Sequence, residues 1–146
     1  MPTSEESREL IDRFTKEVFN NKNLQYAEEF LADDFVEHQE FPGITPDKKG
    51  AIEAFRLLFE TSPDLTAEIN EVIVSGDRVA IRGTFRGTDT GGFFPGMEPT
   101  NKPYVMESID IVTIGDDGRF HAHWGIQDTM GAMQQLGLAP SGPPPA

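Results

Sequence analysis

Residues 118–138, GRFHAHWGIQDTMGAMQQLGL, decide the fold, because a strand pattern here runs directly into a helix pattern. Residues 119–127 alternate in polarity, as expected for a strand with one apolar face. The apolar face holds Phe120, Ala122, Trp124 and Ile126, and the other face holds Arg119, His121, His123 and Gln127. After Asp128, methionines and leucines recur at helical spacing, and Gly137 is a natural stop for that helix.

Asp128 joins the strand to the helix, and two roles fit it. Continuing the strand period places its carboxylate on the face of Trp124, where an apolar pocket would raise its pKa toward the range useful for proton transfer. Aspartate is equally a favoured N-cap for the helix that follows. This stretch alone therefore leaves a catalytic acid and a structural cap as alternatives.

The composition of the 146 residues restricts the partners. Twelve basic against 25 acidic side chains give a formal charge of -13, which argues against nucleic acid and membrane surfaces, since both attract clustered Lys and Arg. The chain has no cysteine, so disulfides, thiolate nucleophiles and Cys-ligated metals are excluded. No leader-like or membrane-spanning apolar run is present, and we expect a cytoplasmic location.

The order of the predicted elements indicates an α+β fold. Helical patterns come first, at residues 4–20, 24–31 and 47–61, with a brief strand at 35–38. Four longer β-rich runs follow, at residues 65–74, 79–88, 104–114 and 120–127. Short turns join two of the pairs, so these strands should form an antiparallel sheet with the helices on one face. We expect residues 1–138 to form one domain and the Pro-rich residues 139–146 a flexible tail.

The long loop at residues 89–103 is rich in Gly and Pro and carries Phe93, Phe94 and Met97. Apolar side chains on a flexible loop suit a lid over a cavity. They equally suit a loop tip that docks on the core or on a second subunit.

The remaining polar candidates are the histidines and one strand acid. His38 precedes a Pro-Gly turn, where it could donate to a substrate carbonyl or cap its own strand. His121 and His123 form an H-x-H pair that lacks the further ligands of a metal site, and alternation turns the pair away from Trp124, toward solvent or a subunit, unless a bulge re-aims one of them. Asp110 interrupts an apolar strand and is a candidate second pocket group, with a surface carboxylate as the alternative.

The chain resembles the SnoaL-like polyketide cyclases, also called ester cyclases, of the nuclear transport factor 2-like superfamily. Residues 123–138, HWGIQDTMGAMQQLGL, are similar to the family's ending of His-Trp, a spacer, Asp, and a helix that finishes Gln-Leu-Gly. Supporting matches are Glu37-His38, SPDL at 62–65, GDRV at 76–79 and GTDTG at 87–91. The resemblance covers nearly the whole chain and implies a cone-shaped, curved antiparallel sheet closed by three N-terminal helices around an apolar pocket.

Characterised members of this family close a ring of a polyketide ester by intramolecular aldol condensation, without a metal or cofactor. The resemblance implies that Asp128 is the catalytic acid/base and that His38 polarises the substrate carbonyl. The side chains then expected to contact substrate are Trp124, His123, Asp110, Phe94, Phe35 and Met106.

We therefore expect a cofactor-independent cyclase, of the lyase or isomerase type, that acts on a small apolar, carbonyl-rich molecule. The exposed face of such a sheet also predicts a homo-oligomer, either a dimer or a tetramer. The alternatives are a non-enzymatic ligand-binding or dimerisation module, or another activity on the same cone, such as isomerisation or epoxide hydrolysis.

Overall fold

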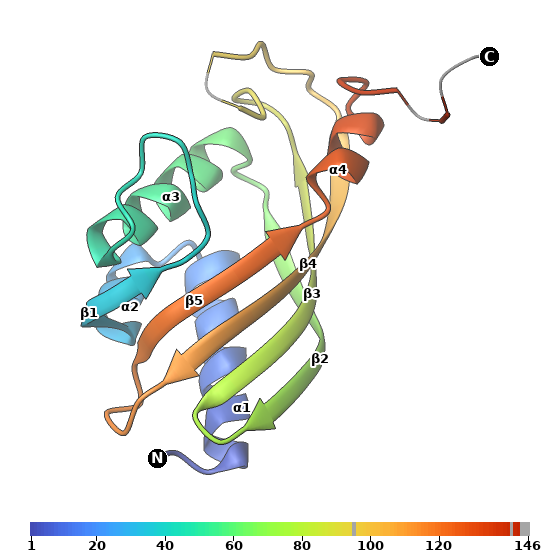
Figure 1. The fold of residues 1–146 in the computed structure, drawn as a ribbon. Coiled ribbons are helices and arrows are strands. Elements are labelled where there is room, and N and C mark those ends of the chain that lie inside the picture. The colour runs from blue at the N-terminus through green and yellow to red at the C-terminus, as the bar shows by residue number, and fades with distance from the viewer. Residues whose placement is uncertain (95, 141, 144–146) are drawn as a thin grey trace.

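The helical patterns near the N-terminus fold as helices, each beginning at a residue whose side chain caps it. The computed structural model describes residues 1–94, 96–140 and 142–143. Its helices in this region are α1 (Ser4–Phe14), continued by a π-helical segment η1 (Thr15–Asn20), then α2 (Leu24–Phe30) and α3 (Lys48–Thr61) (Figure 1). Thr3, Asn23 and Asp47 accept a hydrogen bond from the backbone N–H of the third residue onward, which satisfies one free donor at each helix start.

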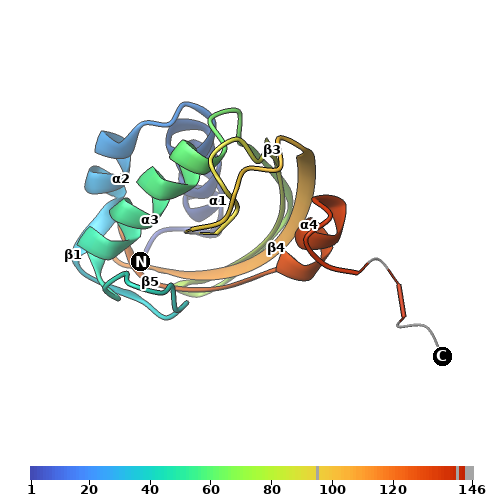
Figure 2. The same cartoon turned by 90° about the horizontal axis from the view of Figure 1, so that it is seen from above.

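The β-rich runs form one five-stranded sheet in the order β1-β5-β4-β3-β2. Its strands are β1 (Leu31–Glu37), β2 (Thr66–Ser75), β3 (Arg78–Thr88), β4 (Pro103–Ile114) and β5 (Phe120–Gln127), and α4 (Thr129–Gln135) follows. Strands β2 to β5 pair antiparallel, and β1 joins the edge parallel to β5. Figure 2 shows the sheet curving around α1 and α3, so the predicted α+β cone is confirmed.

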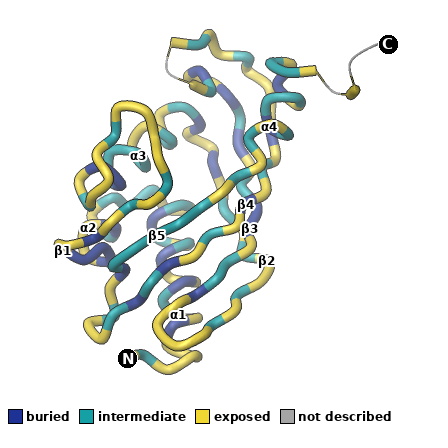
Figure 3. Tube along the Cα trace, viewed as in Figure 1, coloured by how far each residue is buried: buried dark blue, intermediate teal, exposed yellow. Residues whose placement is uncertain are grey.

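The inner face of this sheet is identified by its buried pairs, such as Val79 opposite Val112. Exposed positions alternate with buried or half-buried ones along the strands (Figure 3). The register between β4 and β5 shifts by one residue. Ile114 pairs with Phe120, but the preceding residue, Thr113, pairs with Ala122. His121 is therefore the extra residue of a β-bulge, which reverses the alternation along β5.

Aromatic side chains hold the helices against the inner face. The ring of Phe14 lies 5.6 Å from Phe30, 6.0 Å from Phe55 and 4.9 Å from Phe120, measured between centroids. Because these residues come from α1, α2, α3 and β5, one cluster links every layer of the fold. The pairs of Phe14 with Phe30 and Phe55 are edge-to-face, and such pairs add to the free energy gained by burial.

A fully buried carboxylate fastens the loop between β3 and β4. Asp89 accepts hydrogen bonds from Gly92 N at 2.9 Å, from Thr100 N at 3.0 Å and from Thr100 Oγ1 at 2.9 Å. Phe93 in this loop packs on Tyr104 of β4, with ring centroids 5.5 Å apart, whereas Phe94 is 39% exposed. The sequence left open whether this loop is a lid over a cavity or docks on the core or a second subunit. Phe93 docks on the core.

None of the helices in the described parts of the chain combines the length and apolar character that a bilayer crossing requires. The predicted tail at residues 139–146 lies partly outside the described residues, because 141 and 144–146 are not among them.

We predict that Asp89→Ala lowers the free energy of unfolding by about 2–3 kcal/mol, because it leaves buried N–H donors without an acceptor. Asp64 is the matched control, since it also accepts from a backbone N–H and a hydroxyl, both of Thr88, but is exposed. Chemical denaturation of both variants checks this, and an equal loss for Asp64→Ala would contradict it.

Candidate functional site

Three strands bring three ionisable side chains together on the inner face of the sheet. Glu37 is the last residue of β1, and its register partner on β5 is His123. Asp110 lies in the middle of β4, opposite Gly125 of β5. Because register partners share a face, all three side chains point toward the helices.

The ring of His123 lies between two carboxylates. Its Nδ1 is 2.7 Å from Glu37 Oε1, and its Nε2 is 2.7 Å from Asp110 Oδ1. A neutral imidazole has one N–H and could donate to only one carboxylate, whereas an imidazolium donates to both. We call this arrangement the Glu37–His123–Asp110 cluster.

The cluster shifts the pKa of its histidine. Burial by itself lowers the pKa of His123, but the hydrogen bonds to Asp110 and Glu37 and their negative charges outweigh it and raise the pKa to about 9. The ring is therefore charged at neutral pH. Together with two carboxylates it gives the cluster a formal charge of -1.

Further hydrogen bonds orient the two carboxylates. Ser108, two residues before Asp110 on β4, donates from Oγ to Asp110 Oδ2 at 2.5 Å. The backbone N–H of Gln39 donates to Glu37 Oε1 at 3.0 Å. Charge-assisted bonds of this kind are short and directional, so the cluster has one preferred geometry.

Apolar side chains lie on the same inner face as the cluster and in the core beside it. Ile81 of β3 is the register partner of Asp110 and lies on the same inner face. The half-buried Ile52 and Phe55 of α3 pack against the same core from the other side. The side chains of Glu37, Asp110 and His123 remain 8%, 19% and 20% exposed, so Asp110 and His123 are the more accessible members.

The model of the SnoaL-like polyketide cyclases matches residues 9–136 of the chain. The chain belongs to this family. Among solved structures, IdmH, a candidate polyketide cyclase from Streptomyces antibioticus, is 30% identical with a TM-score of 0.77, over 90% of this chain and 98% of IdmH. No curated protein matches the chain.

Two further solved structures share the architecture. A candidate polyketide cyclase from Acidithiobacillus ferrooxidans is 26% identical with a TM-score of 0.79, over 96% of this chain and 100% of that one. TsrD from Streptomyces laurentii is 24% identical with a TM-score of 0.84, over 95% of this chain and 100% of TsrD, a likeness that concerns the fold alone.

Asp128, which the family resemblance implies as acid/base, lies apart from the apolar interior. Its side chain is exposed and accepts a hydrogen bond from Gly131 N at 2.9 Å, which makes it the N-cap of α4. Of the alternatives open from the sequence, the structure shows the geometry of the cap.

His38 and Trp124 lie on the outer face of the sheet, opposite to the face of the Glu37–His123–Asp110 cluster, and their contact with substrate stays a prediction. Their rings stack with centroids 4.4 Å apart, and the Arg78 guanidinium lies 5.0 Å from the Trp124 ring. The physical reason is the bulge at His121, which places Trp124 outside when Phe120 is inside. The same bulge points His123 inward rather than toward solvent.

The three apolar side chains expected to contact substrate besides Trp124 lie in different surroundings. Phe35 is 4% exposed and belongs to the main core, and its contact with substrate stays a prediction. Met106 is half-buried on the inner face opposite Phe85. Phe94 lies on the exposed part of the loop after β3.

Sequence reasoning assigned no site role to four polar residues of this inner face: Glu37, Gln39, Ser108 and Gln127. The i, i+2 spacing of Ser108 and Asp110 could have indicated that both belong to one site, because residues at this spacing share a strand face. Glu37 gave no comparable signal, since its place depends on β1 pairing with the distant β5.

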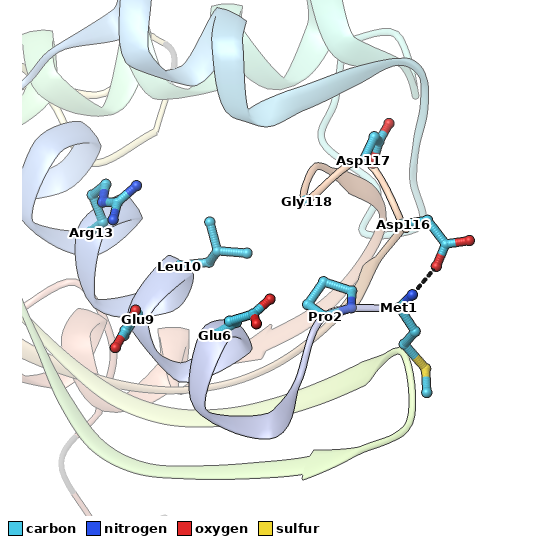
Figure 4. Close-up of a pocket in the computed structure, with 9 residues that line it drawn as sticks. All are labelled: Met1, Pro2, Glu6, Glu9, Leu10, Arg13, Asp116, Asp117 and Gly118. Atoms are coloured by element: carbon cyan, nitrogen blue, oxygen red, sulfur yellow. Dashed lines mark ion pairs between the residues drawn. The ribbon is translucent and has the colours of Figure 1, made fainter.

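The surface also carries two charged hollows, and neither includes the cluster. One, of about 410 Å³, lies between the start of α1 and the turn after β4, where the amino group of Met1 pairs with Asp116 (Figure 4). The other, of about 550 Å³, lies beside the start of α3 and is lined by Lys48, Lys49 and four acidic residues. Their charged linings do not suit an apolar ligand.

We predict that His123 makes the stability of the protein depend on pH. Its folded pKa of about 9 exceeds the ordinary value of 6.5, so its contribution is fully present below about pH 6.5 and is lost as the pH rises through about 9. The full contribution is on the order of 3 kcal/mol. Urea unfolding of wild type and His123→Gln across pH 6 to 10 measures this difference.

The matched control is His38→Gln, which removes an exposed histidine of the outer face. The pKa of His121 is also raised, chiefly by its hydrogen bond to Asp117, but His121 is present in every variant and cancels in the comparison. Parallel pH profiles for wild type and His123→Gln would contradict the prediction.

Proposed function

We propose that the protein is a cofactor-independent cyclase that closes a ring of a small, carbonyl-rich, largely apolar molecule by an aldol-type reaction. The observation that carries the proposal is the Glu37–His123–Asp110 cluster on the apolar inner face of the cone. Membership in the polyketide cyclase family supports the substrate class. Enolate chemistry requires a positioned side chain that can remove and return a proton, here in apolar surroundings.

In this proposal Asp110 is the acid/base. Its Oδ1 lies 2.7 Å from His123 Nε2, and its carboxylate removes a proton from a carbon flanked by two carbonyls. The resulting enolate carbon attacks a second carbonyl carbon of the same molecule and forms the new C–C bond. The oxygen of that carbonyl then takes the proton back from the Asp110 carboxyl group.

Glu37 serves as a positioning residue. It is less exposed than Asp110, and its carboxylate fixes the His123 ring through Nδ1. The half-buried apolar side chains of α3 and β3 would fold the substrate into a reactive shape and keep water away.

Asp128 is the alternative acid/base within the same function, as the family resemblance implies. The favoured reading assigns it the cap of α4 instead, since its side chain is exposed and bonded to Gly131 N. Asn is also a good N-cap, so Asp128→Asn removes the acid while keeping the cap.

The first test is exchange of α-protons, which needs no knowledge of the natural substrate. We predict that the wild-type protein accelerates deuterium exchange at the central carbon of ethyl acetoacetate in D2O, followed by proton NMR. Asp110→Asn should lower the enzymatic rate by about 100-fold or more, the usual effect of losing a general base. Asp128→Asn should retain most of the rate.

The reverse pattern, with exchange lost in Asp128→Asn and kept in Asp110→Asn, would transfer the acid/base role to Asp128. Exchange no faster than in buffer would contradict the catalytic proposal and favour a ligand-binding module. Circular dichroism of each variant controls for folding.

We further propose that the outer face of the sheet binds a second copy of the chain. This face exposes large apolar side chains, among them Ile73 at 57%, Ile109 at 59% and Ile126 at 79%. Light scattering after size exclusion should give at least twice the chain mass of 16.2 kDa, and Ile126→Glu should shift the protein toward the monomer. A wild-type monomer at micromolar concentration would sink this proposal.

A further inference from the structure

In the described part of the chain, His121 has no register partner on either neighbouring strand. The pairing of β5 with β4 and its pairing with β1 both include Phe120 and Ala122, and both pass over residue 121. The register of β5 is therefore interrupted at one position, on both sides of the strand.

The side chain of His121 forms a link at this interruption. Its Nδ1 lies 2.9 Å from Asp34 Oδ1, and its Nε2 lies 3.0 Å from both carboxylate oxygens of Asp117. Asp34 belongs to residues 32–35 of β1, which the β1–β5 register also passes over, and Asp117 lies in the turn between β4 and β5. The ring thus ties the unpaired residue of β5 to the unpaired stretch of β1 and to the turn. We call this arrangement the Asp34–His121–Asp117 clip.

A glycine makes room for the ring of the clip. A Cβ added at Gly115 would lie 2.6 Å from His121 Nε2 and 3.0 Å from Asp117 Oδ1. The first distance is shorter than an ordinary contact of a carbon atom, so a side chain at residue 115 would displace the ring. The turn therefore accommodates the clip because residue 115 has no side chain.

A regular strand without the bulge would suit the apolar pattern of β5 better than the observed one. With Phe120 inward, strict alternation would also turn Trp124 and Ile126 inward. In the structure both face outward, and Ile126 is 79% exposed in the single chain. Hydrophobic burial alone thus favours a register that would turn His123 outward, and specific bonds must offset it.

We propose that His121 is a positioning residue, whose clip holds the bulge that turns His123 toward the helices. Without the clip, β5 populates the regular register, in which His123 leaves Glu37 and Asp110 and faces outward. The Glu37–His123–Asp110 cluster stabilises the same bulged register from the inner face, so the clip and the cluster act together. The catalytic consequence rests on the proposed function, since the position of His123 then governs proton transfer.

The test is ¹⁵N NMR with saturation transfer on the His123 ring, which measures the population of an outward form. His121→Ala removes both bonds of the clip and should raise the ratio of outward to inward form by about 2- to 30-fold, the usual effect of two exposed ion pairs. In the outward form the ring should titrate near the ordinary value of 6.5 rather than about 9. Arg119→Ala is the matched control, since Arg119 bonds to Asp117 only through its backbone N–H among the described residues.

The indole nitrogen of Trp124 gives an independent reading, because Trp124 is the only tryptophan in the chain. A change of register moves Trp124 and His123 to opposite faces together, so both should show the same minor population. A minor form seen at His123 without one at Trp124 would be motion of the ring alone and would overturn the inference.

Deletion of residue 121 separates placement from other effects of the histidine. Without that residue, regular alternation puts Phe120 inward, Ala122 outward and His123 inward, so the strand no longer needs a bulge. The deletion variant should therefore keep the inward form that His121→Ala loses in part. An outward population that does not rise in His121→Ala, or that rises equally in the deletion variant, would also overturn the inference.

Deuterium exchange at ethyl acetoacetate distinguishes this role from the proposed function. The exchange rate of His121→Ala should fall in proportion to its inward population. A rate that falls while the inward population is unchanged would show that His121 acts in another way, which contradicts the positioning role. An outward population that rises as expected, in a protein that exchanges no α-protons, would support the positioning role while rejecting the cyclase chemistry.

Discussion

A charged histidine held between two carboxylates, inside an otherwise apolar cone, is the constraint on which the rest of the site depends. Burying an imidazolium costs several kcal/mol unless both ring nitrogens find acceptors, and here Glu37 and Asp110 supply them at 2.7 Å. The two acceptors come from β1 and β4, on either side of β5. The parallel pairing of β1 and the inward rotation of His123 are therefore both necessary for the charge to be buried.

The aromatic core and the polar cluster have complementary roles. Phe14 and its neighbours lock the helices onto one part of the inner face, so that the strands beneath them hold a fixed register. The polar side chains lie further along the same face, where Asp110, Gln39 and His123 converge over Gly125. Rigid strands position this chemistry, which is a more exact support than a loop would give.

Local patterns in the sequence were sufficient for the fold but not for the site. Helix periodicity, caps and hairpin turns are properties of neighbouring residues, and they gave the α+β cone correctly. The face of each β5 side chain depended on one extra residue, His121, whose bulge arises from how β4 and β5 pair. That pairing reversed the predicted surroundings of Trp124, and no periodicity within β5 could reveal it.

The cap of α4 and the pairing of β1 also could not be predicted from local sequence patterns. Asp128 fitted two roles by its sequence position, and only the path of the chain after β5 distinguished them. Glu37 reaches His123 across 86 residues, a separation at which spacing carries no information. Asp110 and His123 were found as candidates singly, since polar residues inside strands are unusual, but their contact belongs to the tertiary structure.

The most direct test of this account is the protonation of the His123 ring, measured by ¹⁵N NMR with His123→Gln for assignment. Both ring nitrogens should carry protons at pH 7.5, and the ring should titrate near pH 9. A ring with one unprotonated nitrogen at pH 7.5, titrating at or below the ordinary value of 6.5, would contradict it.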